Sequence, residues 1–269
     1  MRKQTKNSFD NYIGDILKDG IVSFLDNLGI RHRMEQDKFI LKGSGSRIRI
    51  PPVNEDIAYA LGYVCGDGCL SSPQPRKNKG GFRFKIAICF SSSEKGKSRA
   101  MEISKIFRQH FNYAPRLIKI KGKGRQDWFS MEITSAVIYA YFFQLGLPVG
   151  TKYGKLNVPP AVLKKRLFKE FLRGLIDSDG HIGKDGRIWI VQKDSIFRNK
   201  VRELSLQFLN IRFSNPRPNT KRVGDRIYTW YYMMTFMADK VSPSIFTRSI
   251  SMKNEAIFKP EENRLYVPG

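Results

Sequence analysis

Two nine-residue segments, residues 60–68 and 172–180, constrain the fold of this chain more than any other feature. Each is a mainly apolar stretch that ends in Asp-Gly, with Asp67 in the first copy and Asp179 in the second. Their apolar spacing is typical of helices, so both aspartates are expected at helix ends. One Asp-Gly pair is a common turn, but two copies that close similar helices indicate a shared role.

Small residues recur four positions apart in each segment, which places them on one face of a helix. The pairs are Gly62 with Gly66, and Gly174 with Ser178. A glycine inside a helix costs about 1 kcal/mol relative to alanine, so its presence needs a packing reason. The spacing predicts that the two helices lie directly against each other. Gly68 and Gly180 are expected in the left-handed conformation that ends many helices.

Asp67 and Asp179 are expected where an anion is disfavoured. Each lies at the C-terminal, negative end of its helix dipole. If the helices pack in parallel, the two carboxylates also repel each other in a partly dry site. A divalent cation removes both penalties, and Mg²⁺ accepts aspartate oxygens, main-chain carbonyls and water. The sequence therefore predicts a metal site at the paired helix ends.

The other expected elements follow one order twice, which indicates an internal duplication. Strands are expected at 82–90, 116–121 and 128–133, then at 187–192, 211–215 and 226–236, with helices at 98–111, 135–147, 196–209 and 239–246. We expect an α+β fold of two pseudo-symmetric αββαββα halves that pack through the paired helices, with antiparallel sheets forming a saddle. The expected domains are 51–158 and 159–269, after an N-terminal accessory segment, 1–50, with a helix at 13–28 and strands at 38–42 and 47–50.

The chain is strongly basic, with 48 Lys and Arg against 24 acids and a net charge of +24. Nucleic acid is the commonest partner of such a chain, although a membrane surface or a cationic solubility surface are alternatives. No apolar run is long enough to span a membrane, and the N-terminus lacks the features of a signal peptide. The three cysteines fit neither a disulfide framework nor a zinc site, so a reducing, cytoplasmic setting is expected. The three scattered histidines offer little basis for a catalytic triad.

Basic side chains gather on the strands and loops, where they could hold a DNA duplex in the saddle. Strand alternation places Arg83 and Lys85 opposite Phe82 and Phe84, and it separates basic from apolar positions in the same way around 119 and 187. The DNA-contacting candidates on strands are Arg83, Lys85, Lys119, Lys121, Arg187, Trp189 and Lys193, and those in loops are Arg76, Lys77, Lys79, Arg217, Lys221, Arg222 and Arg226. The aromatic cluster Tyr228, Trp230, Tyr231 and Tyr232 is expected in the core or stacked on bases.

Residues 172–180 resemble the LAGLIDADG motif and depart from it only at Arg173 and Ser178. Residues 60–68 resemble it more loosely but keep an aspartate at the eighth position. The chain therefore resembles a two-motif, single-chain LAGLIDADG homing endonuclease of the kind encoded by archaeal introns. The resemblance extends over about residues 53–260 as a repeat pattern and does not cover the first 50 residues.

The resemblance implies a monomer that hydrolyses both strands of a long, pseudo-symmetric target in double-stranded DNA. Asp67 and Asp179 would bind Mg²⁺, or Mn²⁺ or Ca²⁺ in its place, with the main-chain carbonyls of Gly66 and Ser178. The family also uses a lysine and a polar residue near each metal. By position, Lys152 and Lys253 resemble the lysines, with Arg248 as a rival for the second, and Gln192 resembles the polar residue, with a counterpart within Ser91–Ser93.

Two other functions fit the same resemblance. One is an RNA-binding intron maturase, which could also be bifunctional, and the other is a DNA-binding regulator without catalytic activity. Neither requires both aspartates. Because Asp67 and Asp179 are both retained, the sequence favours the nuclease.

Overall fold

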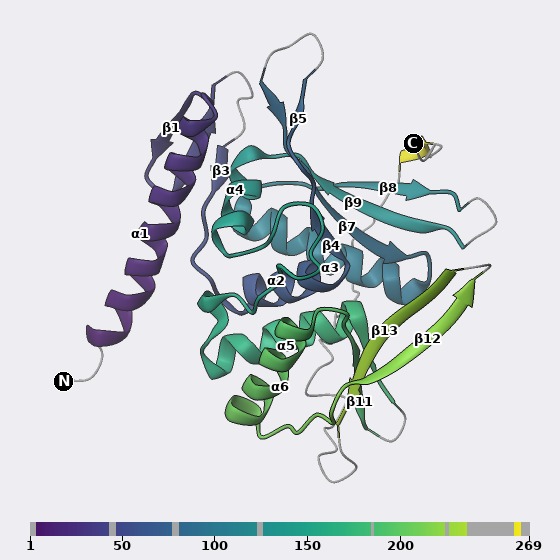
Figure 1. Cartoon of the computed structure of the whole chain (residues 1–269). Coiled ribbons are helices and arrows are strands. Elements are labelled where there is room, and N and C mark those ends of the chain that lie inside the picture. Colours follow the sequence, from purple (N-terminus) through teal and green to yellow (C-terminus); the bar gives the residue numbers. More distant parts are fainter. Residues whose placement is uncertain are drawn as a thin grey trace. The chain divides into compact units, whose positions relative to one another are not determined.

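The computed structural model describes residues 4–42, 47–76, 81–122, 126–183, 186–223, 226–235 and 261–264 (Figure 1). These residues form two compact units. The first unit draws on Met1–Val53, Gly68–Leu145 and Ile250–Gly269, and the second on Asn54–Asp67 and Gly146–Ser249. The units reflect packing rather than the repeat, so the division at residues 50 and 158 stays a prediction. No described helix is both long enough and apolar enough to cross a membrane.

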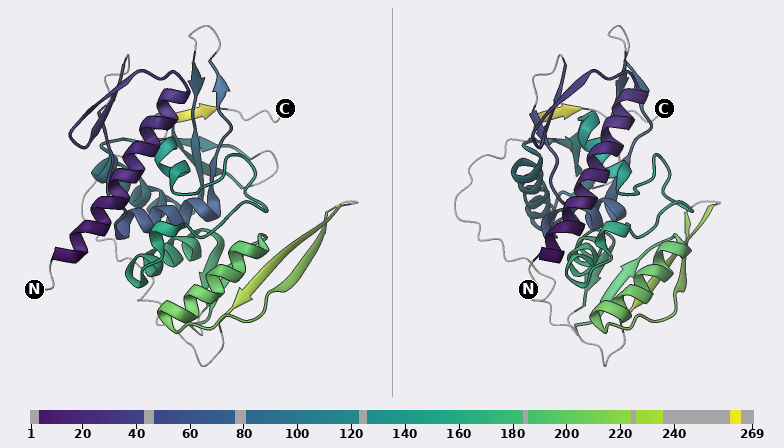
Figure 2. Two further views of the ribbon diagram at one scale, coloured as in Figure 1. Left: turned by 60° about the vertical axis from the view of Figure 1, so that its left-hand side comes forward. Right: turned by 90° about the vertical axis from the view of Figure 1, so that its left-hand side faces the viewer.

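The second unit is built on two long helices, α2 (Glu55–Asp67) and α5 (Lys165–Asp179), which pack against each other. A four-stranded antiparallel sheet has the order β10-β11-β13-β12. The remaining elements are η1 (Pro160–Val162), β10 (Gly180–Ile182), β11 (Ile188–Val191), α6 (Ser195–Leu209), β12 (Arg217–Val223) and β13 (Arg226–Met234). The β12–β13 hairpin forms a long two-stranded ribbon in both views of Figure 2.

Local chemistry explains where these helices begin and end. The side chain of Asn54 accepts a hydrogen bond from the main-chain N–H of Ile57 at 3.0 Å, which caps α2. Asp194 caps α6 in the same way, through the N–H of Phe197 at 3.1 Å. Asn210 then ends α6 in the left-handed conformation, with φ of 57°, a geometry that asparagine tolerates better than most residues.

The first unit contains a five-stranded sheet of order β14-β8-β9-β7-β4, in which only β14 runs parallel to its neighbour. A three-stranded sheet, β1-β2-β3, and a hairpin, β5-β6, complete its strands. The elements are α1 (Gln4–Asn27), β1 (His32–Glu35), β2 (Lys38–Leu41), β3 (Arg47–Arg49), β4 (Gly68–Leu70), β5 (Gln74–Pro75), β6 (Phe82–Arg83), β7 (Ile86–Ser91), α3 (Glu94–Phe111), β8 (Arg116–Ile120), β9 (Trp128–Ile133), α4 (Ala136–Gln144) and β14 (Glu261–Arg264). In the N-terminal segment, α1 packs on α4, with Leu17, Ile21 and Leu25 buried.

The two sheets share one topology. After α2, the strands lie in the order β4-β7-β9-β8, with α3 between β7 and β8 in the chain. After α5, the equivalent order is β10-β11-β13-β12, with α6 between β11 and β12. This repetition confirms the predicted α+β fold with antiparallel sheets. The helix expected at 239–246 lies outside the described residues.

Several local predictions were wrong. Gly180 is extended, with φ of −137°, because it enters β10 directly and its hydrogen faces the carbonyl of Trp189. Gly68 likewise begins β4 and is absent from the residues with positive φ. The strand expected at 82–90 is broken into β6 and β7, so Phe82 is exposed rather than buried.

The region after α6 also differs from the prediction. Residues 211–215 make only an isolated bridge, between Phe213 and Thr235, whereas Arg217–Val223, expected as a loop, forms the edge strand β12. The segment contains Pro218 and several basic residues. An edge strand tolerates proline and basic residues because one side of its backbone needs no partner strand.

Candidate metal centre and nucleic-acid surface

The backbones of α2 and α5 touch where the glycines lie. A Cβ atom on Gly62 would overlap the carbonyl oxygen of Phe171, and one on Gly174 would overlap that of Tyr59. Only a hydrogen fits at either position. The close helix contact predicted from the four-residue spacing is therefore confirmed.

The same contact continues to the helix ends. A Cβ on Gly66 would overlap the hydroxyl of Ser178 and would lie 3.1 Å from Cγ of Asp179. The Ser178 hydroxyl is turned back onto its own helix, where it lies 3.1 Å from the carbonyl oxygens of Gly174 and Leu175. The small residues thus allow the C-terminal end of α5, which carries Asp179, to pack directly against the backbone at the C-terminal end of α2.

Asp179 is disfavoured as an anion in this position. Its pKa is raised from 3.8 to about 7, first by burial and next by the negative charge of Asp67, while Lys152 acts in the opposite direction. One pKa unit corresponds to about 1.4 kcal/mol between the charged and neutral forms. The two aspartates therefore interact electrostatically, and a positive charge placed between them would stabilise both.

Lys152 lies beside the two aspartates on the segment between α4 and η1. Its ammonium donates hydrogen bonds to the main-chain carbonyls of Cys65, at 2.8 Å, and Gly66. These carbonyls belong to the last turn of α2, where a cation is favourable. The structure therefore places the lysine, the Gly66 carbonyl and both aspartates in one unit.

Gln192 reaches the same centre from the end of β11. Its side-chain amide donates to Oδ2 of Asp179 at 3.4 Å, and its side-chain oxygen accepts from the N–H of Asp194 at 3.3 Å. Its counterpart in the first half was expected within Ser91–Ser93, where the hydroxyls of Ser91 and Ser93 lie 2.7 Å apart. Lys253 and Arg248 lie outside the described residues.

The centre offers oxygen ligands for a hard divalent cation. Two carboxylates and the carbonyl of Gly66 lie together, and this donor type suits Mg²⁺, Mn²⁺ or Ca²⁺. Within the described ranges there is no group of three His, Cys, Asp or Glu side chains that could hold a metal. Water or a substrate oxygen would have to complete the shell. Cys65 does not compete as a nucleophile, because burial raises the pKa of its thiol to about 12.

One face of the second unit's sheet is aromatic and basic. The rings of His181 and Trp189 stack with centroids 5.8 Å apart, and Tyr232 lies 5.6 Å from Trp189. The Arg187 guanidinium lies over Trp189 at 5.8 Å. Ile188 and Ile190 are buried on the opposite face, so the alternation predicted for this strand is confirmed.

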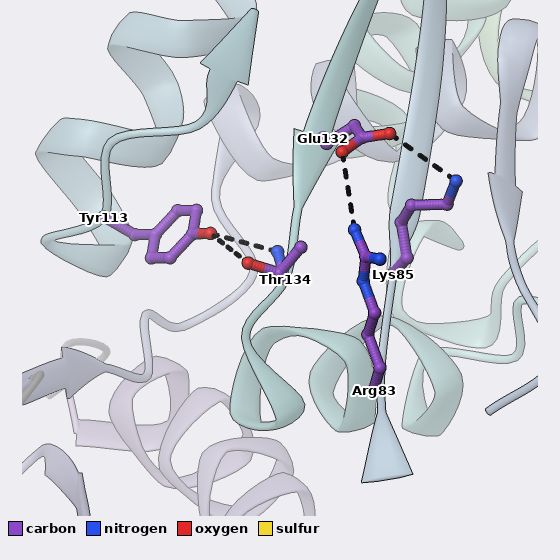
Figure 3. A network of polar contacts seen from close by, with 5 residues as sticks. All are labelled: Arg83, Lys85, Tyr113, Glu132 and Thr134. Atoms are coloured by element: carbon purple, nitrogen blue, oxygen red, sulfur yellow. Dashed lines mark hydrogen bonds and ion pairs between the residues drawn. The ribbon is translucent and has the colours of Figure 1, made fainter. Parts of the chain in front are cut away.

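The first unit's sheet carries a network of charges on one face (Figure 3). Glu132 accepts ion pairs from Lys85 at 3.5 Å and Arg83 at 4.0 Å. With Arg76 and Arg116, these residues line a hollow of about 700 Å³. Arg116 was missed in the sequence, although its register with Glu132 places it on this face.

Other predicted contact residues lie elsewhere. Lys119 is paired in register with Phe129, which puts it on the face opposite Glu132, and its ammonium lies 3.4 Å from Asp127. Lys121 is exposed just after β8, and Lys193 is exposed just after β11. In the second unit, Arg217, Lys221, Arg222 and Arg226 belong to the β12–β13 hairpin rather than to a loop. Lys77 and Lys79 lie outside the described residues.

Comparison with known proteins identifies part of the chain. Residues 168–230 match the family described as a LAGLIDADG-like domain. This match confirms the resemblance seen at residues 172–180. The matched segment runs from Phe168 in α5 to Trp230 in β13, so it contains Asp179, Gln192 and Trp189.

Several solved structures are similar to part of this chain at low sequence identity. Mesophilic variants of the homing endonuclease I-DmoI are 18% identical, with 69% of this chain and 90% of that chain covered and a TM-score of 0.48. I-DmoI in complex with DNA and Ca is also 18% identical, with 69% and 85% covered and a TM-score of 0.48. The N-terminal LAGLIDADG domain of DUF199/WhiA is 14% identical, with 73% and 83% covered and a TM-score of 0.41.

Proposed function

We propose that this protein is a site-specific homing endonuclease that makes a metal-dependent double-strand break in DNA. The supporting observation is the paired helix ends, where the half-buried Asp179 lies beside Asp67 and has a pKa of about 7. Such a pair of carboxylates is unfavourable without a cation. Strain of this kind at a small-residue helix contact is typical of a functional site.

The chain's own residues divide the work of phosphodiester hydrolysis. Asp67, Asp179 and the carbonyls of Gly66 and Ser178 would hold the cation, which when bound neutralises phosphate charge and lowers the pKa of an attacking water. Lys152 would place its ammonium next to the charge that develops on the phosphate. The Gln192 amide would orient Asp179 and a water near it. Lys253 is proposed for the second half by its position in the sequence.

The basic sheets and loops would hold the DNA. With a net charge of +24, most contacts would fall on phosphates, which give affinity but do not read sequence. The proposed contact residues are Arg76, Lys77, Lys79, Arg83, Lys85, Lys119, Lys121, Arg187, Trp189, Lys193, Arg217, Lys221, Arg222 and Arg226. We propose that one chain with two LAGLIDADG halves acts as a monomer on a pseudo-symmetric duplex. All three cysteines are thiols, which suits a reducing compartment.

One observation favours a second function. The stacked His181, Trp189 and Tyr232 offer ring faces beside Arg187, and such faces suit unpaired bases. An intron maturase that binds RNA would use them. The maturase is the second candidate because it leaves the carboxylate pair unexplained.

The test is a cleavage assay with Mg²⁺ present. The substrate is a DNA in which the two sequences that flank the chain's own gene are joined directly to each other. We expect the wild type to cut both strands, and Asp67→Asn and Asp179→Asn to bind the same DNA without cutting it. Glu203→Gln, which removes an exposed carboxylate of α6, is the control and should cut normally. A wild type that binds intron RNA tightly but cuts no candidate DNA would support the maturase instead. Normal cutting by both aspartate variants would refute the assigned site.

A further inference from the structure

Asp194 is a buried carboxylate whose two oxygens accept hydrogen bonds from two different segments of the chain. It is 3% exposed and lies between β11 and α6. One oxygen, Oδ1, accepts from the N–H of Phe197 at 3.1 Å and caps α6. The other, Oδ2, accepts from the N–H of Gly154 at 2.7 Å. The second contact joins α6 to the segment that carries Lys152.

The segment held by Asp194 is a tight turn. The N–H of Lys155 donates to the carbonyl of Lys152 at 3.0 Å, and Gly154 has φ of 73°, a conformation that favours glycine. Tyr153 belongs to the turn, and the Lys193 ammonium lies 4.8 Å from the centre of its ring. Lys152 is therefore the first residue of a turn. Gly154, two residues after it, binds this turn to the β11–α6 connection.

The connection itself is firmly held. Arg198 donates to the carbonyl of Gln192 at 2.8 Å, and its guanidinium stacks 4.7 Å from the ring centre of Tyr231. The Gln192 side chain bridges the N–H of Asp194 and the carboxylate of Asp179. Asp194 thus fixes the Lys152 turn to a connection that is already fixed to Asp179.

Helix capping alone does not require an aspartate at this position. The equivalent residue of the first half is Ser93, whose single hydroxyl oxygen caps α3 through the N–H of Gly96 at 3.2 Å. Serine and aspartate are about equally good caps, and a buried carboxylate carries a larger desolvation penalty than a hydroxyl. The second oxygen of Asp194 is explained by Gly154.

We propose that Asp194 is a positioning residue that holds the Lys152 ammonium against the last carbonyls of α2. The inference that this matters for DNA cleavage rests on the proposed function. The placement of Lys152 can be tested without it.

Chemical labelling of amines measures the placement directly. The full-length protein, without DNA or metal, is treated with a trace of an amine-reactive reagent, and the rate at each lysine is read by mass spectrometry. Lys152 is half-buried and donates to two carbonyls, so it should react more slowly than Lys155, which is exposed in the same turn. In Asp194→Ser the Lys152 rate should rise several-fold, while the Lys155 rate stays constant.

Three variants separate the contact of Asp194 with Gly154 from its capping of α6. Asp194→Ser keeps a capping oxygen but is too short for Gly154, and Asp194→Asn keeps one acceptor oxygen for two donors. Ser135→Ala removes the cap of α4 in the first unit and controls for a general loss of stability. An unchanged Lys152 rate in both Asp194 variants, or an equal rise in Ser135→Ala, would overturn the proposal.

A double-mutant cycle tests the link to cleavage. Displacing a positioned group can lower kcat by about ten- to a hundredfold, so Asp194→Ser should lower kcat without weakening DNA binding. If Asp194 acts through Lys152, Asp194→Ser should have no further effect in a Lys152→Ala background. Additive effects would overturn this route. If the wild type cuts no DNA, the proposed function fails. The labelling rates still test whether Asp194 holds Lys152 in place.

Discussion

Single residues at the helix ends show how this chain tolerates two neighbouring acids. The ammonium of Lys152 lies on the carbonyls that end α2, and it lowers the pKa of Asp179, which burial and Asp67 raise. It is a cation supplied by the chain itself. Because it offsets only part of the shift, the carboxylate pair keeps an affinity for a further positive charge.

The raised pKa of Asp179 predicts how stability depends on pH. Between pH 3.8 and about 7 the folded state keeps a proton that the unfolded state has lost, so stability falls as pH rises through this window. Asp179→Asn removes the penalty. At pH 8 this variant should be more stable than the wild type by up to about 4 kcal/mol, and the difference should vanish near pH 3.5. Urea unfolding in a chelator at several pH values measures it.

Glu203→Gln, which removes an exposed carboxylate of α6, is the matched control and should leave this pH window unchanged. Mg²⁺ should stabilise the wild type at pH 8 but not Asp179→Asn. Equal stability of wild type and Asp179→Asn at pH 8 would mean that Asp179 is solvated and that the helix ends carry no electrostatic strain.

The sequence could place the two aspartates at paired helix ends, since a helix dipole and a repeat are readable from residue order. Gln192 was expected beside them only through the family resemblance, and its role stays a proposal. The resemblance also placed Lys152, by its position in the chain. Asp194 could not be predicted, because its second contact, with Gly154, joins residues 40 positions apart in the chain. A turn residue before a helix reads as an ordinary cap until its neighbour in space is known.

At the scale of elements, the α2–α5 contact depends on glycines that leave no room. Gly174→Ala would gain about 1 kcal/mol in helix propensity, but its Cβ would overlap the carbonyl of Tyr59, and overpacking costs about 1–3 kcal/mol. Because the obstacle is backbone rather than a flexible side chain, the cost should lie at the upper end, and we expect a net loss of up to about 2 kcal/mol in stability. Gly20→Ala in α1 is the matched control, since its Cβ would meet only the flexible end of Gln144.

Calorimetry of the two variants decides the sign. Gly20→Ala should be neutral or slightly stabilising, and Gly174→Ala should lower the Tm. If Gly174→Ala raised the Tm as Gly20→Ala does, the two backbones could not lie in contact. The prediction follows from a spacing that was visible in the sequence, because period and residue size are local properties.

Strand pairing was less predictable. The alternation in β7 and β11 was correct, since buried isoleucines mark one face. The break between β6 and β7 and the extension of β12 were missed, because both depend on partner strands. β6 pairs with β5, and β12 pairs with β13 along its whole length. A segment such as Arg217–Val223 becomes a strand only when a neighbour accepts its hydrogen bonds.

At the scale of the whole molecule, the excess of positive charge predicts binding that is sensitive to salt. Each neutralised phosphate contributes a slope of about −0.9 to the logarithm of affinity against the logarithm of salt concentration, so six to ten contacts give roughly −5 to −9. Binding of the wild type to duplex DNA, measured between low and moderate salt, should fall in this range. Arg76→Ala, at one of the proposed contact residues, should reduce the magnitude of the slope by roughly 1. A slope near zero would exclude phosphate contacts as the main source of affinity.

The chain passes between its two packing units more than once, and this has a consequence for how it can be divided. α2 precedes the first sheet in the chain, yet it packs with α5 in the second unit. A cut anywhere between α4 and α5 would leave one fragment carrying a helix whose residues Ile57–Cys65 are buried in the intact protein. Such a fragment would aggregate alone and would fold when its other half is supplied. We therefore expect two such fragments to complement each other, with the α2–α5 helix pair as their interface.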